Sequence, residues 1–129
     1  MSPIDWATRP LTKYADFSGR APRAEYWWFY LLSIVAYIVA TIVDSVIGTG
    51  AALGSYGILS LVVMLGLVIP SLAAGVRRLH DTDRSGWWML IVLVPLVGAI
   101  VLLVFFVLEG TKDDNRFGPN PYSGELGYA

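Results

Sequence analysis

The sequence predicts an all-α integral membrane protein with three hydrophobic helical segments. Of the 129 residues, 56% are hydrophobic and only 15% are charged, and the mean hydropathy is +0.61, values that do not suit a water-soluble domain of this size. Residues 26–47, 56–76 and 87–108 each form an apolar stretch long enough to cross about 30 Å of hydrocarbon as a helix. None has the polar stripe of a soluble surface helix. We therefore expect a single membrane domain over residues 1–129.

Composition also argues against several functions. The absence of cysteine excludes disulfides, thiolate catalysis and cysteine-based metal sites. A net charge of −1 provides no basic field for nucleic acid, so we expect no nucleic-acid partner. A single histidine and scattered carboxylates favour neither a metal site nor a cofactor.

The N-terminal segment, residues 1–25, is expected to be cytoplasmic and partly interfacial. Leu11, Tyr14 and Phe17 would share one face of a short helix, with Lys13 on another. This pattern is typical of a segment lying on the membrane surface. A partly ordered tail is the alternative.

The first span begins with an aromatic cluster. Tyr26, Trp27 and Trp28 are predicted to anchor the helix at the headgroup level, where amphipathic rings settle. Glu25, just before them, favours the positive end of the helix dipole. Asp44 lies near the other end of the span, and we expect it to reach the interface there.

The second span carries no ionisable side chain. It follows an uncharged linker, residues 48–55, of a length that joins antiparallel neighbours. Gly66, Ser71 and Gly75 are small residues that favour close helix packing, and Pro70 predicts a kink.

The third segment contains two helix breakers, Pro95 and Gly98. If residues 87–108 nevertheless cross completely, the polar C-terminal tail, residues 109–129, lies outside. If the segment breaks there and re-enters, the tail returns to the cytoplasm. The sequence leaves both alternatives open.

The distribution of basic residues predicts the orientation. No basic residue lies in the first loop, and those near the span ends are Arg9, Lys13, Arg20, Arg23, Arg77, Arg78 and Arg84. The N-terminus and the loop 77–86 should therefore be cytoplasmic.

The segment 77–88 follows ordinary rules for helix ends. Arg77 and Arg78 suit the negative end of the second span, and Ser85 is a plausible N-cap for the third. Trp87 and Trp88 are predicted interface anchors. These rules leave unexplained His80 and the clustering of arginines on the cytoplasmic side. We assign no catalytic residue, and the candidate ligands of an anionic headgroup are Arg20, Arg23, Arg77, Arg78, His80 and Arg84.

Four motifs together resemble the bacterial membrane-protein family called domain of unknown function 805. They are GRAPRAEYWW at 19–28, RRLHDTDRSGWW at 77–88, PLVG at 95–98 and NRFGPNP at 115–121. The resemblance covers roughly residues 14–121 and implies a small inner-membrane protein, without catalytic residues to carry over. It also implies that residues 115–121 are more than a disordered tail; if they pack with the loop 77–88, both lie on one side of the membrane, which favours the re-entrant alternative. One departure is Asp83, where the pattern has glycine, which bears on the local turn.

The leading hypothesis is a non-enzymatic, multi-pass component of the bacterial cytoplasmic membrane. It would act through helix association or anionic headgroup contacts at the cytoplasmic face, with membrane lipids, further copies or other membrane proteins as partners. The alternatives are an enzyme or carrier subunit acting on an anionic lipid or lipid-linked phosphate, and a homo-oligomeric pore.

Overall fold

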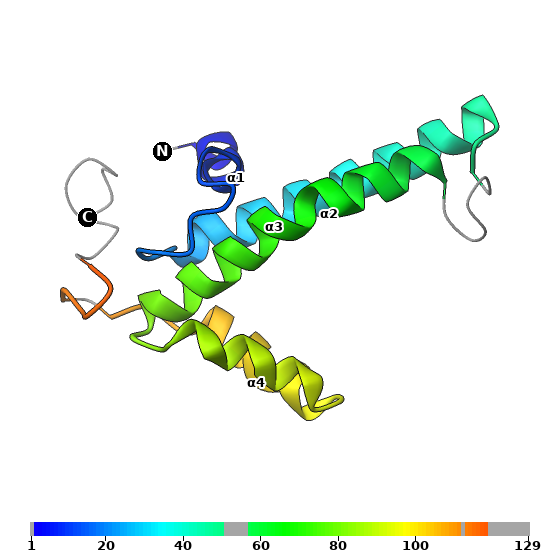
Figure 1. Ribbon diagram of the computed structural model, residues 1–129. Helices are drawn as coiled ribbons and strands as arrows, with labels where there is room; N and C mark the ends of the chain where they lie inside the picture. Colours follow the sequence, from blue (N-terminus) through cyan, green and yellow to red (C-terminus); the bar gives the residue numbers. More distant parts are fainter. Residues whose placement is uncertain (1, 51–56, 112, 119–129) are drawn as a thin grey trace.

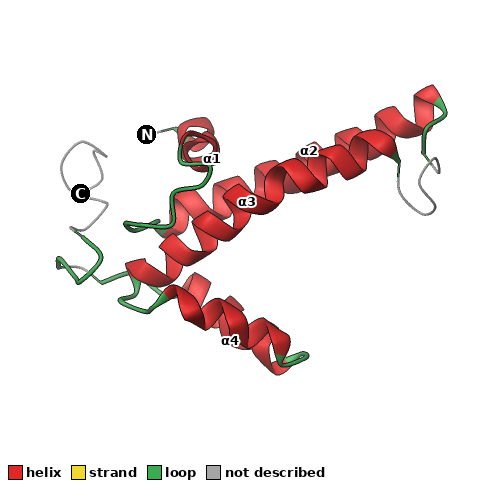
Figure 2. Ribbon diagram, viewed as in Figure 1, coloured by secondary structure: helices red, strands yellow, loops and turns green. Residues whose placement is uncertain are grey.

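The computed structural model describes residues 2–50, 57–111 and 113–118, and these form helices and loops without a strand (Figure 2). The elements are α1 (Pro3–Thr12), α2 (Arg23–Ile47), α3 (Ile58–Asp81), the 3-10 helix η1 (Gly86–Leu93) and α4 (Val97–Val107). Helices α2 and α3, with 25 and 24 residues, are long and apolar enough to cross a membrane. The all-α prediction with three apolar segments is therefore confirmed.

All elements converge at one end of the molecule (Figure 1). Helices α2 and α3 form a long antiparallel pair, and α1 lies across one side of it. The elements η1 and α4 form a second, shorter hairpin that starts from the end of α3 and diverges from the α2–α3 pair on the other side. The observed helices extend beyond the predicted apolar stretches: α2 starts at Arg23 and α3 continues to Asp81. Charged side chains near these two helix ends are buried.

The third segment is broken where Pro95 and Gly98 indicated. The Val97 N–H donates to the Pro95 carbonyl (2.7 Å) and closes a three-residue turn around Leu96, whose φ of 64° and ψ of −59° are strained for leucine by about 1–3 kcal/mol. A Cβ on Gly98 would lie 1.7 Å from the Ile91 carbonyl oxygen, so α4 and η1 are in direct contact there. The chain thus returns to the end of α3, as in the re-entrant alternative.

Helix α1 starts earlier than the sequence pattern indicated. We expected a short interfacial helix around residues 11–17, but the helix ends at Thr12. The Ser2 hydroxyl accepts from the Asp5 N–H (3.2 Å) and the Asp5 carboxylate accepts from the Ser2 N–H (3.1 Å). This capping box fixes the helix start, and Trp6 and Pro10 are buried.

Asp44 closes the turn between α2 and α3 from inside. Its carboxylate accepts hydrogen bonds from the N–H groups of Leu59 (3.0 Å) and Ser60 (2.8 Å) and from the Thr49 hydroxyl (2.6 Å). It therefore caps the N-terminus of α3 from another helix. A Cβ at Gly57 would lie 2.1 Å from this carboxylate, so the position needs glycine. Asp44 is 1% exposed, so its carboxylate is bound inside the protein near this end of the helix pair.

Tyr14 completes the hydrogen bonding of α3. Pro70 has no N–H, so the Gly66 carbonyl four residues earlier loses its helical partner. The Tyr14 hydroxyl donates to that carbonyl. Because an unpaired carbonyl is costly in hydrocarbon, this bond ties the N-terminal segment to the second span.

Replacing Tyr14 with phenylalanine should lower the free energy of unfolding by about 1 kcal/mol, because the Gly66 carbonyl is left without a donor. In a Pro70→Ala background the loss should be smaller, since alanine restores the missing helical N–H. Reversible unfolding in detergent micelles measures all four proteins of this double-mutant cycle. An equal loss in both backgrounds would show that the tyrosine acts elsewhere.

Candidate functional site

A cluster of ionised side chains lies where α1, α2 and α3 meet the chain that follows α4. We call it the charged junction, and its members are Arg9, Arg20, Glu25, Arg77, Arg78 and Asp81. Glu25, Arg77 and Arg78 are 0% exposed. Charges removed from water in this way must be paired and hydrogen-bonded.

Glu25 joins the first three helices. One carboxylate oxygen accepts a hydrogen bond from Arg77 of α3, and the other lies 2.9 Å from Nε of Arg9 of α1. Sequence reasoning assigned Glu25 only to the helix dipole and missed this role. Its charge, placed just before an apolar helix, was the available signal.

The loop before α2 is held at Asp16. The Ser18 hydroxyl (2.7 Å) and the Ser18 N–H (2.9 Å) both donate to its carboxylate. These hydrogen bonds lower the pKa of the Asp16 carboxyl below its usual 3.8. Its backbone carbonyl accepts from Nε of Arg77 (3.0 Å), which links the loop to α3.

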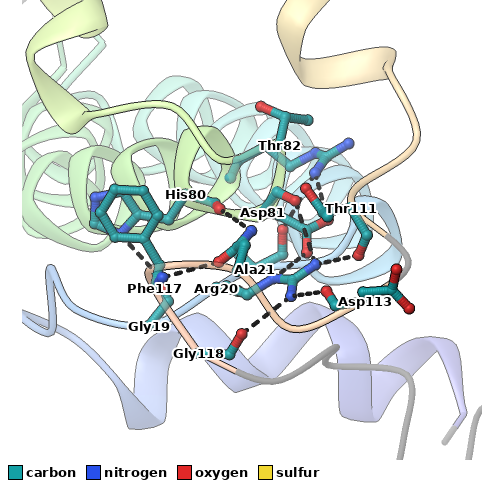
Figure 3. A network of polar contacts seen from close by, with 12 residues as sticks. Gly19, Arg20, Ala21, His80, Asp81, Thr82, Thr111, Asp113, Phe117 and Gly118 are labelled. Atoms are coloured by element: carbon teal, nitrogen blue, oxygen red, sulfur yellow. Dashed lines mark hydrogen bonds and ion pairs between the residues drawn. The ribbon is translucent and has the colours of Figure 1, made fainter.

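Asp81 joins the end of α3 to two arginines (Figure 3). One carboxylate oxygen accepts from Nε of Arg20 (3.0 Å) and the other from Nη1 of Arg78 (2.8 Å). Its backbone carbonyl accepts from the Thr111 N–H (2.8 Å). A Cβ on Gly110 would lie 1.9 Å from the carboxylate, so the chain after α4 passes directly over it.

The other guanidinium donors of Arg20 and Arg78 bind backbone carbonyls. Arg20 donates to the carbonyls of Asp81, Thr111, Asp113 and Gly118, and Arg78 to those of Ala21, Phe106 and Leu108. The Phe106 and Leu108 carbonyls lie at the C-terminal end of α4, where helical partners are lacking. Arg78 therefore caps α4, and Arg20 holds the segment after it.

His80 contacts the chain that follows α4 through its ring and its backbone carbonyl. Its Nδ1 lies 2.9 Å from the Gly19 carbonyl, which can only accept, so Nδ1 carries the proton. Its ring stacks on Phe117 with centroids 3.8 Å apart, and the Asn115 side chain donates to its backbone carbonyl (2.9 Å). Asn115 and Gly118 exchange two backbone hydrogen bonds of 3.0 Å. Residues 115–118 thus pack against the loop, the condition under which the sequence favoured the re-entrant alternative, and residues 119–121 lie outside the described residues.

Asp83 occupies a position suited to glycine. The Arg84 N–H donates to the Leu79 carbonyl and the Asp83 N–H to the His80 carbonyl, both at 2.9 Å, the pattern of a Schellman motif. Asp83 has a φ of 61°, which aspartate tolerates better than most residues. Its side chain pairs at the surface with Arg116 (3.3 Å).

The six residues predicted to bind a headgroup separate into two sets. Buried in or beside the junction are Arg20, Arg77, Arg78 and His80. Arg23 is exposed and donates to the Val107 carbonyl (3.3 Å), and Arg84 is half-buried over the Phe105 ring (4.2 Å). The six therefore do not line one common surface.

The predicted interface anchors also separate. Trp28, Trp87 and Trp88 are exposed. Tyr26 and Trp27 pack inward on α4: the Tyr26 ring lies 4.6 Å from the Phe106 ring, and the Trp27 Nε1–H donates to the Phe106 carbonyl (3.1 Å). The latter two thus contribute mainly to packing.

A second feature lies beside the junction on α2. A pocket of about 370 Å³ is lined by Arg23, Ala24, Trp27, Trp28 and Leu31. Their spacing places them along one face of the first two turns of the helix. The pocket combines one cation with an apolar wall.

The chemistry available in the junction is mainly structural. Each of its carboxylates contacts two arginines, and His80 is occupied by Gly19 and Phe117. Across residues 2–50, 57–111 and 113–118, no three His, Asp or Glu side chains are grouped as metal ligands.

Glu25→Gln should lower the free energy of unfolding by about 3 kcal/mol or more, because the buried Arg77 loses its counter-charge. The matched control is Asp83→Asn, which removes an exposed carboxylate and keeps a residue that tolerates positive φ, and it should cost less than about 1 kcal/mol. Unfolding in detergent micelles measures both. Similar costs for the two would mean that the buried pair is not a principal constraint.

Comparison with known proteins places this chain in a family. The chain is 42% identical to inner membrane protein YhaH of Escherichia coli K12 over 118 residues, covering 92% of this chain and 97% of the relative. It is 41% identical to inner membrane protein YhaI of the same strain over 121 residues, covering 94% and 98%. No solved structure matches the chain. Residues 14–119 match the profile of a family described as "Protein of unknown function (DUF805)", and this membrane protein belongs to that family.

Proposed function

We propose that the protein is a non-enzymatic component of the bacterial cytoplasmic membrane that binds anionic phospholipid headgroups at its cytoplasmic face. The observation that carries the proposal is the pocket of Arg23, Trp27, Trp28 and Leu31. Its cation is exposed and has no carboxylate partner among the described residues.

The pocket suits a phospholipid at both of its ends. A guanidinium forms paired, charge-assisted hydrogen bonds with a phosphate group. Trp28 supplies an exposed ring that favours the headgroup level, and Leu31 continues the wall toward the acyl region, about 12 Å along the helix from Arg23 at 1.5 Å per residue. A cationic site with an apolar continuation therefore favours a lipid over a small soluble anion.

The charged junction supports this pocket. Arg23 is the first residue of α2, and the preceding Pro22 and Ala21 are buried. The Ala21 N–H donates to the Arg77 carbonyl (2.9 Å). The start of α2, and with it the Arg23 backbone, is thus held against α3 in one position.

The predicted orientation places this end of the molecule in the cytoplasm. Basic residues gather before α2 and after the apolar part of α3, and none lies in the linker 48–55. Anionic lipids give the cytoplasmic leaflet a negative surface potential, which favours arginine there. The proposal of an enzyme or carrier subunit using Arg77, Arg78 and His80 has less support, because these side chains bind other parts of the protein.

Arg23→Gln should weaken binding of phosphatidylglycerol about fivefold, the effect of losing about 1 kcal/mol from one basic residue at a membrane surface. The matched control is Arg116→Gln, an exposed arginine outside the pocket, which should bind as the wild type does. Native mass spectrometry of the protein titrated with phosphatidylglycerol, and separately with phosphatidylcholine, measures both.

Equal retention of the two lipids by the wild-type protein would overturn the proposal. So would turnover of a lipid-linked phosphate by the purified protein that is lost on His80→Ala, because the protein would then be an enzyme.

A further inference from the structure

A groove of about 570 Å³ runs between α2 and α3. Its walls are Tyr26, Phe29, Tyr30, Ser33, Ile34, Tyr37 and Ile38 of α2, and Val63, Met64, Leu67, Val68, Ser71 and Leu72 of α3. It continues the surface on which the base of the η1–α4 hairpin packs. There Tyr26 contacts Phe106 (4.6 Å between rings), and a Cβ on Gly75 would lie 3.1 Å from the Met89 methyl group.

The tip of the η1–α4 hairpin leaves backbone groups without partners. Pro95 has no N–H, so the Val92 carbonyl lacks the partner that a 3-10 helix would supply. The Leu96 N–H makes no hydrogen bond with any described residue. The residues at the tip are largely uncovered by the rest of the protein: Leu93 is 76% exposed and Leu96 is 75% exposed.

The hairpin cannot lie at the membrane surface. Residues 86–108 contain no charged, amide or hydroxyl side chain, so neither face of the hairpin suits water and an interfacial position is excluded. Its tip therefore lies in hydrocarbon. Irregular backbone at that depth occurs only where protein or a water-filled cavity covers it, so the tip requires a covering surface.

The groove and the tip lie at similar depths. The Phe106 carbonyl accepts from Nε of Arg78 (2.9 Å), so the hairpin base is level with Arg78. Helix α4 has 11 residues and reaches at most about 16 Å from that level at 1.5 Å per residue. The groove extends along α3 from Leu72 to Val63, about 9 to 22 Å from Arg78 by the same rise. In two copies with the same orientation, the tip of one therefore lies at the depth of the part of the groove of the other that is nearer Leu72.

The groove offers suitable hydrogen-bonding groups. Tyr30, Tyr37 and Ser71 are among the residues that line it, and their hydroxyls make no hydrogen bond within the part of the chain that the structure describes. Hydroxyls can donate to a free carbonyl or accept from a free N–H. The protein's own tip does not use them, because its hairpin diverges from the α2–α3 pair (Figure 1).

We propose that two copies of this protein form a reciprocal dimer in which the hairpin tip of each, around Leu96, packs into the α2–α3 groove of the other. A two-fold axis along the membrane normal satisfies both contacts at once, because such an interface uses the same two patches on each copy. The groove shares no lining residue with the Arg23 pocket, so this dimer does not rest on headgroup binding.

Cysteine crosslinking tests the dimer, because the natural chain has no cysteine. Two copies with different affinity tags are expressed together, one carrying Leu96→Cys and the other Val68→Cys, a groove residue about 15 Å from Arg78 along α3, and native membranes are oxidised. Both positions are exposed, at 75% and 42%, so the variants should fold. The expected product is a disulfide-linked dimer carrying both tags, at least tenfold more abundant than with the control Val35→Cys, a 49% exposed residue of α2 outside the groove.

Three results would overturn the proposal. The first is no two-tag dimer, and the second is equal crosslinking with Val35→Cys. The third is a single chain with both cysteines that forms only an internal disulfide, which would mean that the hairpin closes on its own groove. Normal phosphatidylglycerol binding in any of these cases would leave the Arg23 proposal standing.

Discussion

Buried charge that must be neutralised inside the protein is the constraint on which the rest of this structure depends. Arg77, Arg78 and Glu25 have no exposed surface, and a buried charge left without a partner costs several kcal/mol. The segments that carry their partners are therefore held in one arrangement. Glu25 and Arg77 hold α1, α2 and α3 together, and Arg20, Arg78 and Asp81 add the chain after α4. The apolar helices then extend from this end with few contacts between the two arms (Figure 1).

The sequence predicted what depends on neighbouring residues. Apolar length predicted the helices, and Pro95 with Gly98 indicated where the third segment could break, because each effect acts within a few residues. Pairings such as Arg20 with Asp81, 61 positions apart, leave no local pattern. For the same reason the capping of α3 by Asp44 was not predicted, and the arginines were assigned to one surface. Their clustering was detected correctly, but burial depends on the tertiary fold. The start of α1 was missed because the capping box of Ser2 and Asp5 was not used.

The arginines differ in role because their surroundings differ. Arginine suits the junction because it stays charged and offers several donors in a planar array, which Arg20 and Arg78 use for a carboxylate and several carbonyls each. Arg23 lies only three residues from Arg20, yet it faces outward at the start of α2. The arginine-containing motifs of this chain thus combine buried supports, such as Arg78, with exposed cations, such as Arg23 and Arg116, and the motif alone does not distinguish the two.

The order in which the chain is synthesised determines when the segment that follows α4, which includes Asn115 and Phe117, can bind His80 and the junction. Arg20 donates to the Gly118 carbonyl, so a nascent chain carries Arg20 through most of translation before its last acceptor exists. Helices α2 and α3 can form first, because their contacts with each other lie within residues 23–81. The contacts of Arg20 and Arg78 in the junction are complete only after α4 and the segment that follows it have been synthesised. A chain that stops before residue 106 lacks the Phe106 and Leu108 carbonyls that Arg78 binds, so two hydrogen bonds of this guanidinium, which also pairs with Asp81, cannot form and the end of α3 is left with unsatisfied donors until α4 is complete.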